Sequence, residues 1–412
     1  MERKLSVLCL LPSVPVPAET GGTQRSLAIV TALDQSFSVT VVGLLSPGCD
    51  TEGFRKQLRG RLIVVDPMGS MFWRLTAEPR ALLRGAPLRY ARYASPPVRV
   101  ALQRVLQQQR FDLVHFDHPH MGQLLPLVRR MQPWARIVLD EHNVEAQVID
   151  GFAALLRWPQ RALLHRQADR VMGLERRLVQ EADATLACSD INAAELRRFG
   201  ARHVEVIPNG TTRLDSEALG PRNDRRVLVF VGSLDWLPNI DAAMRLVTKI
   251  WPRARDAMPG SLLAIVGRKP PPRLVARSSE RDVLITGRVE SVAPYLRIAR
   301  ATAIPLRAGS GTRIKILEAW AAGVPVITSR LGAEGLAYED QENLLLAESD
   351  QEFADAMVRV WHDSDLAHHL TSGGAQTATR YEQAKIDQRL VSFYAGWLSS
   401  AEVRAAERSA RA

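Results

Sequence analysis

The chain has 412 residues, a length that suggests two domains. Its composition, 46% hydrophobic and 24% charged residues, is typical of a globular protein and excludes a disordered or fibrous chain. No apolar run approaches the roughly 18 residues of a membrane span. The three cysteines, Cys9, Cys49 and Cys188, form no C-x-x-C pair, which argues against a disulfide framework and a cysteine zinc site. Scattered cysteines fit a reducing compartment, so we expect a cytoplasmic protein.

The formal net charge of +10 is concentrated in one segment. Residues 55–110 contain 12 Lys and Arg but only two acidic residues. Aromatic residues make up only 6% of the chain and no nucleic-acid motif occurs, so we expect no nucleic-acid partner. Within the segment, Phe72, Trp73, Leu82 and Leu83 lie among arginines, a mixture that predicts contact with an anionic membrane surface. A solubilising basic face enriched in Arg by composition is the alternative.

Short apolar runs alternate with helical patterns through the first half of the chain. Strands are expected at 5–11, 39–45, 62–65, 113–116, 137–139, 184–187 and 204–207. Helices are expected at 23–33, 98–109, 122–131, 160–181 and 192–199. This alternation is typical of a parallel, doubly wound α/β sheet.

The alternation restarts after a polar stretch that contains Gly220 and Pro221. Strands are then expected at 227–231, 262–266, 283–285, 302–304, 325–328 and 344–346, and helices at 241–250, 313–322, 352–361 and 386–398. We therefore expect an N-terminal domain at 1–210, a linker at 211–225 and a C-terminal domain at 226–382. A helix at 383–399 is expected to pack back on the N-terminal domain, before a frayed tail at 400–412.

The strongest local signal is a turn between a strand and a helix in the second half. Gly309, Ser310 and Gly311 allow the backbone to approach a ligand closely. Ser310 or Thr312 is expected to cap a helix that begins near Arg313. The N-terminus of such a helix attracts an anion, because its free N–H groups and its dipole are both positive.

Charged residues follow this turn directly. Arg313 and Lys315 lie in the first helical turn, where the helix dipole disfavours cations, so their presence indicates a bound anion such as a phosphate. Glu318 lies one turn further and is able to accept hydrogen bonds from a diol such as a ribose. A solvated helix face with an ion pair at i,i+3 spacing is the alternative.

Three histidines crowd the end of one expected strand. His115, His118 and His120, together with Asp117, imitate the spacing of a metal site, but the sequence offers no complete ligand set. We therefore expect no metal there, and either an acceptor contact or an ordinary loop remains open.

Several segments resemble retaining glycosyltransferases of family 4, which have the GT-B fold. The segments occur in the family's order, at 21–25, 140–145, 188–196, 229–239, 264–270, 285–295 and 313–334. The resemblance implies two Rossmann-like, doubly wound domains that face a central cleft. The likeness is greatest to bacterial sugar transferases of exopolysaccharide biosynthesis.

The resemblance also implies roles for individual residues. A nucleotide-sugar donor would be held mainly by the C-terminal domain, with Glu318 on the ribose and Arg288 and Val289 against the base. Gly21 and Gly22 would approach the diphosphate, and His142 would contact the donor sugar. The donor-binding residues implied in this way are Gly21, Gly22, Gly232, Ser233, Arg288, Val289, Ser310, Gly311, Thr312, Lys315 and Glu318.

Two positions depart from the family pattern. Ser310 replaces the first glutamate of the E-x7-E motif, and Ser233 and Asn239 stand where many members carry Arg and Lys. We expect the positive charge to come instead from Arg268, Lys269, Arg313 and Lys315, which with His142 form the expected catalytic set.

The expected reaction needs no divalent metal and transfers a sugar, with retention of configuration, to a saccharide or a lipid-linked acceptor. Such an enzyme could act peripherally on the inner face of the cytoplasmic membrane. A silent nucleotide-sugar-binding subunit, suggested by Ser310, and a sugar-nucleotide epimerase are the alternatives.

Overall fold

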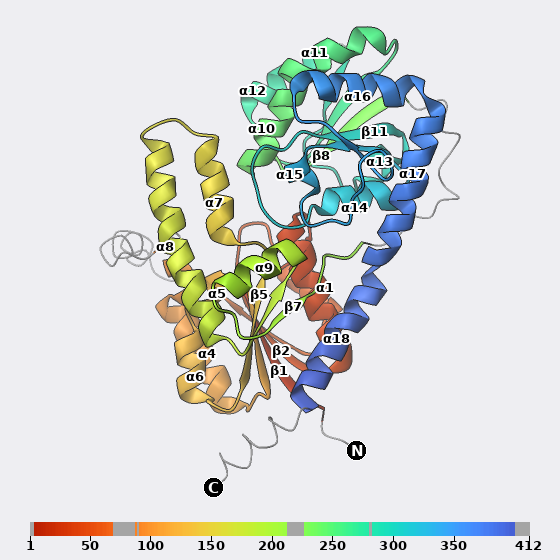
Figure 1. Ribbon diagram of the computed structural model, residues 1–412. Coiled ribbons are helices and arrows are strands. Elements are labelled where there is room, and N and C mark those ends of the chain that lie inside the picture. The colour runs from red at the N-terminus through yellow and green to blue at the C-terminus, as the bar shows by residue number, and fades with distance from the viewer. Residues whose placement is uncertain (1–3, 69–86, 89, 212–225, 280–281, 400–412) are drawn as a thin grey trace. The chain divides into compact units, whose positions relative to one another are not determined.

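The computed structural model describes residues 4–68, 87–88, 90–211, 226–279 and 282–399, which form two compact units (Figure 1). Unit 1 combines Met1–Asp150, Ala162–Pro208 and Ile386–Ala412, and unit 2 combines Gly151–Arg161 and Asn209–Lys385. Most of the expected linker and the whole expected tail lie outside the described residues.

Unit 1 is built on a seven-stranded parallel sheet with the order β3-β2-β1-β4-β5-β6-β7. Its strands are β1 (Ser6–Leu11), β2 (Ser38–Leu44), β3 (Arg61–Val65), β4 (Leu113–Asp117), β5 (Arg136–Glu141), β6 (Ala184–Ala187) and β7 (Val204–Val206). All six residues of the central β1 are buried, because helices cover both faces of such a sheet. All seven strands coincide with the expected apolar runs.

The helices of unit 1 alternate with these strands. They are α1 (Gly21–Ser36), α2 (Thr51–Gln57), α4 (Pro96–Gln108), α5 (His118–Gly122), α6 (Leu125–Met131), α7 (Glu145–Ala154, which continues into unit 2), α8 (Gln160–Glu181), α9 (Asp190–Arg198) and α18 (Gln383–Ser399). Ile386, Leu390 and Tyr394 lie one turn apart on α18 and join the core that surrounds β1. This packing ties the C-terminal helix to unit 1.

Unit 2 contains a six-stranded parallel sheet with the order β10-β9-β8-β11-β12-β13. Its strands are β8 (Val227–Val231), β9 (Leu262–Val266), β10 (Val283–Ile285), β11 (Ala299–Ile304), β12 (Val326–Thr328) and β13 (Leu345–Leu346). Its helices are α10 (Leu237–Arg245), α11 (Trp251–Ala254), α12 (Pro272–Val275), α13 (Ala293–Arg297), α14 (Ile314–Ala321), α15 (Arg330–Ala333), α16 (Asp350–His362) and α17 (Ser364–Ala378). Two parallel α/β sheets therefore follow one another, as the sequence predicts.

Two expectations about helix starts were wrong. Helix α14 begins at Ile314 and its N-cap residue is Arg313, whose side chain makes no capping hydrogen bond to the helix, so neither Ser310 nor Thr312 occupies the N-cap position. The reason is that the backbone stays extended through Arg313, with φ −88° and ψ 90°. Helix α1 begins at Gly21 rather than Thr23, because Thr20 caps it and exchanges hydrogen bonds with Thr23.

No described helix combines the length and the apolar composition that a membrane span needs. None of the three cysteines forms a disulfide bond. The apolar residues of the basic segment, Phe72, Trp73, Leu82 and Leu83, lie outside the described residues. Within the described part of that segment, Arg99 donates to the carbonyl of Ala94 and Arg110 lies 4.3 Å from the ring centre of Trp134. Part of its charge is therefore engaged in contacts within unit 1.

Candidate functional site

The loops that follow β8 and β9 bring polar side chains together at the carboxyl end of the unit 2 sheet. The Nε atom of Arg268 donates to the Ser233 hydroxyl at 2.8 Å, and the same hydroxyl donates to Asp235 at 2.6 Å. Asp235 also lies 3.3 Å from Arg268 and 3.4 Å from Lys269. The expected cation Arg268 thus contacts Ser233, one of the positions where the sequence lacks a cation, and Lys269 pairs with the neighbouring Asp235.

Lys315 reaches the second such position. Its ammonium donates to the side-chain oxygen of Asn239 at 2.7 Å and lies 4.6 Å from the ring centre of Phe230. A Cβ atom on Gly232 would come within 2.8 Å of Asn239 and 2.9 Å of this ammonium, so a larger residue would have to displace one of these side chains. Lys315, in α14, is therefore held against Asn239, in the first turn of α10.

The environment of Lys315 changes its protonation. Burial, followed by the positive charge of Arg313, lowers the pKa of Lys315 to about 7, although Glu318 acts in the opposite direction. Near neutral pH, the Lys315 side chain is therefore present in both its charged and its neutral form. An anion placed beside it would restore its full charge.

Arg313 is buried, with only 6% of its surface exposed, which argues against a solvated helix face. Its guanidinium donates to the carbonyl of Ser310 and lies against Gly309. Gly309 and Gly311 have φ values of 120° and 82°, so this turn requires glycine at both positions. Ser310 is itself only 5% exposed.

The remaining expected residues of unit 2 occupy other positions at this edge of the sheet. Arg288 follows β10 and is exposed, and Val289 packs against the unit 2 core. Glu318 lies in α14 and is partly buried, close enough to Lys315 to affect its pKa. Thr312 is also partly buried, in the turn before Arg313.

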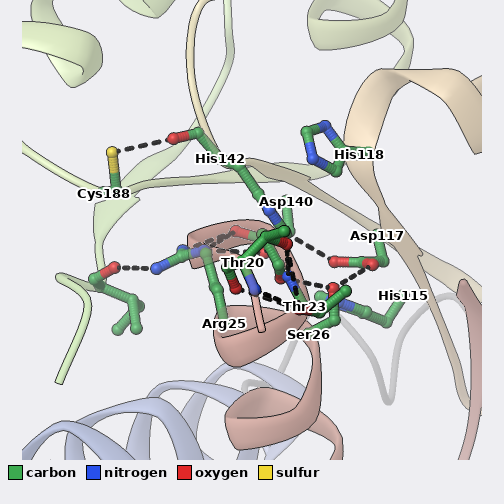
Figure 2. Close-up of polar contacts among 12 residues, drawn as sticks. Thr20, Thr23, Arg25, Ser26, His115, Asp117, His118, Asp140, His142 and Cys188 are labelled. Atoms are coloured by element: carbon green, nitrogen blue, oxygen red, sulfur yellow. Dashed lines mark hydrogen bonds and ion pairs between the residues drawn. The ribbon is translucent and has the colours of Figure 1, made fainter. Parts of the chain in front are cut away.

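A buried ionic network forms at the corresponding edge of the unit 1 sheet (Figure 2). Asp117 ends β4, and its register partner Asp140 lies in β5. Arg25, from α1, donates to Asp140 through Nε at 3.0 Å and Nη2 at 2.6 Å, and to the carbonyl of Ile207 at 2.7 Å. His142 Nε2 lies 2.7 Å from Asp117 and 3.1 Å from Asp140. The positive charges of Arg25 and His142 therefore neutralise the negative charges of Asp117 and Asp140.

This network fixes the protonation of His142. Burial disfavours a charged imidazole, but Asp117 and Asp140 outweigh it and raise the pKa of His142 to about 9. Burial likewise disfavours a charged Asp140, but Arg25 and His142 hold its pKa below the usual value. His142 is therefore a hydrogen-bond donor at neutral pH rather than a base.

Both glycines of the expected N-terminal glycine motif lie in the first turn of α1. Gly21 is exposed, and a Cβ on Gly22 would lie 3.7 Å from His142 Nδ1. His142 thus faces Gly22, and the expected residues of unit 1 are brought together.

The three histidines at the end of β4 have different partners, although the rings of His118 and His120 lie 4.8 Å apart. His115 Nδ1 lies 2.7 Å from the Tyr394 hydroxyl, whereas His120 packs against Tyr90 and Tyr93. Ligand atoms of His115, Asp117 and Asp140 do lie within 4.8 Å of one another. However, Arg25 and His142 already neutralise the two carboxylates, so a divalent ion there would have to displace them.

Two family models match this chain, one on each half. The model described as Glycosyltransferase Family 4 matches residues 20–212, and the model described as Glycosyl transferases group 1 matches residues 225–363. The chain belongs to the GT-B glycosyltransferases.

Relatives and solved structures agree with this assignment. The phosphatidyl-myo-inositol mannosyltransferase of Mycobacterium leprae is 25% identical, over 73% of this glycosyltransferase and 77% of that protein. The solved sucrose-phosphate synthase from Thermosynechococcus elongatus superposes with a TM-score of 0.72 at 19% identity, over 96% and 99% of the two chains. Anabaena HepE, solved in complex with UDP-glucose, has a TM-score of 0.65 at 15% identity, over 95% and 99%.

Sequence reasoning missed the residues that hold His142 in this glycosyltransferase. Asp117 was predicted only as part of the histidine cluster, with an acceptor contact or an ordinary loop as its interpretation, and no role was predicted for Asp140 or Arg25. One signal was available, because the expected strands 113–116 and 137–139 are each followed by Asp, and adjacent parallel strands bring two such carboxylates together at one edge. Nothing in the sequence indicated Arg25 as the counter-ion, since it lies 115 residues from Asp140.

Proposed function

We propose that this glycosyltransferase takes its sugar from a nucleotide-sugar donor. The diphosphate of the donor would bind the cationic loops of unit 2, which are the loops after β8, β9 and β11. The observation that carries the proposal is the set of cations around Gly232: Arg268 on Ser233, and Lys315 on Asn239. The UDP-glucose complex of the structural neighbour HepE supports the donor class.

The chemical role of these cations follows from the leaving group. As the glycosidic bond breaks, negative charge develops on the diphosphate, and cations held in place stabilise it without reorganisation. Arg268, Arg313 and Lys315 supply such charge with no divalent metal. Lys269 adds a further, exposed cation.

We assign the recognition of the rest of the donor to residues on the same unit and to His142. Glu318 accepts hydrogen bonds from the ribose, and Arg288 and Val289 lie against the base. In unit 1, the charged His142 donates a hydrogen bond to the sugar. We propose retention of configuration, in which the acceptor hydroxyl attacks from the face that the diphosphate leaves and a phosphate oxygen takes its proton.

The acceptor is proposed to be a saccharide or a lipid-linked saccharide of polysaccharide biosynthesis. The basic segment 55–110 would then contact the anionic inner face of the membrane. Flotation tests this: binding to anionic liposomes should fall at high salt, and should fall when Arg80, Arg84 and Arg89 are replaced by Glu. Equal binding to neutral and anionic liposomes would exclude the electrostatic contact.

A thermal-shift panel of UDP, GDP and ADP sugars tests the donor class. A donor at 100 times its Kd adds about 2.7 kcal/mol of apparent stability, so the correct one is readily detected. Slow hydrolysis of that donor by the purified protein should release the nucleoside diphosphate. Binding without hydrolysis or transfer would favour a silent subunit, and a change of the sugar without its release would favour an epimerase.

A further inference from the structure

His118 combines a rare backbone conformation with a position next to His142. Its φ is 70°, in the left-handed region that side chains rarely adopt, and Pro119 follows it. Among the described non-glycine residues only Lys269 and Gln341 share a positive φ. Lys269 belongs to the cationic loops of unit 2, and Gln341 lies in an exposed turn. Backbone strain of this kind concentrates at functional sites, where the surrounding structure holds it in place.

The His118 ring lies against the His142 ring in a tilted arrangement. The two ring centres are 3.9 Å apart with an interplanar angle of 38°. Burial and the neighbouring charge of His142 hold the pKa of His118 well below its usual value. One imidazole of the pair is thus charged and the other neutral, so the pair offers hydrogen-bond donors together with an acceptor nitrogen.

One nitrogen of each ring faces the first turn of α1. A Cβ on Gly22 would lie 3.7 Å from His142 Nδ1 and 3.9 Å from His118 Nε2, so both rings border the same space above this glycine. On the opposite side, His118 Nδ1 lies 3.5 Å from a Glu145 oxygen, and 14% of the side chain is exposed. Donors and acceptors paired in this way suit a hydroxyl group, which both donates and accepts.

We propose that His118 is a second sugar-binding histidine of unit 1, which together with His142 hydrogen-bonds a hydroxyl group of the sugar substrate. The inference rests on the proposed function, since it concerns the same reaction. The hydroxyl group belongs either to the donor sugar or to the acceptor, and the experiment below distinguishes these sources.

Two variants test the role of His118, so that the conclusion does not depend on a single replacement residue. His118→Asn keeps a residue that tolerates positive φ, and His118→Phe keeps an aromatic ring on His142 but removes both nitrogens. Gln341→Asn is the matched control, because it makes the same kind of change at a positive φ in an exposed turn. Melting temperature, donor hydrolysis without acceptor, and sugar transfer are measured for each.

We expect kcat/KM for transfer to fall about fivefold to tenfold in both His118 variants, with no matching fall in melting temperature for His118→Asn. Gln341→Asn should match the wild type. A parallel fall in donor hydrolysis assigns the hydroxyl to the donor sugar, and unchanged hydrolysis assigns it to the acceptor. Transfer within twofold of wild type in both variants overturns this inference alone. Failure of the wild type to bind any nucleotide sugar overturns the proposed function as well.

Discussion

The lowered pKa of Lys315 predicts that donor binding takes up a proton. At pH 7.5, a group with a pKa of about 7 is protonated in only about a quarter of the molecules. A diphosphate bound beside the ammonium favours its charged form, so binding should draw about 0.8 proton per site from the buffer. The uptake should shrink to about 0.1 at pH 6, where Lys315 is already charged.

Calorimetric titrations of UDP-glucose, or of GDP-mannose if that is the donor that binds, measure this uptake. The slope of the binding enthalpy against the ionisation enthalpy of several buffers gives the number of protons. Lys315→Arg is the matched control, because arginine keeps its charge at every accessible pH and should remove the uptake. A wild-type slope near zero at pH 7.5, or an equal slope in Lys315→Arg, would refute the reasoning.

Three further predictions concern single side chains. Glu318→Ala should weaken donor binding roughly tenfold to 150-fold with little effect on the melting temperature, and an unchanged donor KM and kcat would reject its assignment to the ribose. Asp140→Asn should lower the free energy of unfolding, measured in urea titrations, by about 3–5 kcal/mol, because Arg25 loses a buried partner. Glu195→Gln, at an exposed ion pair, should lower it by at most about 1 kcal/mol. Equal losses in the two variants would contradict this prediction. The raised pKa of His142 contributes on the order of 3 kcal/mol to the free energy of unfolding, a contribution that is complete below pH 6.5 and lost as the pH rises through about 9. The difference in unfolding free energy between the wild type and His142→Gln should therefore shrink across that range. A difference that stays constant with pH would count against this prediction.

The sheets of both units could be predicted because their strands are short apolar runs between turns. In β1 every residue is buried, so burial on both faces leaves a continuous apolar signal in the sequence. Helix α17 was missed for the opposite reason. It contains Gly373 and Gly374, which disfavour a helix, yet Trp320 occupies the place that a Cβ on Gly374 would need. Tertiary packing outweighs propensity there.

The sequence predicted which charged residues belong to the candidate site, but not which residues they contact. Arg313 and Lys315 were predicted because the helix dipole disfavours cations in a first turn, and Arg268 because the family resemblance implies a cation that Ser233 and Asn239 do not supply. Their contacts depend on the fold, since Lys315 meets Asn239 from 76 residues away. The backbone conformation of His118 could not be predicted either, because the presence of a histidine does not indicate a positive φ.

The affinity of the purified protein for its nucleotide-sugar donor in the presence of EDTA tests the central claim most directly. If the cations of unit 2 hold the diphosphate, the wild type binds the donor under these conditions. Arg268→Met and Lys315→Met should each then raise Kd about tenfold or more, while Lys249→Met, at an exposed lysine of the same unit, leaves it unchanged. Donor binding that needs a divalent ion, or that survives both substitutions unchanged, would contradict the account.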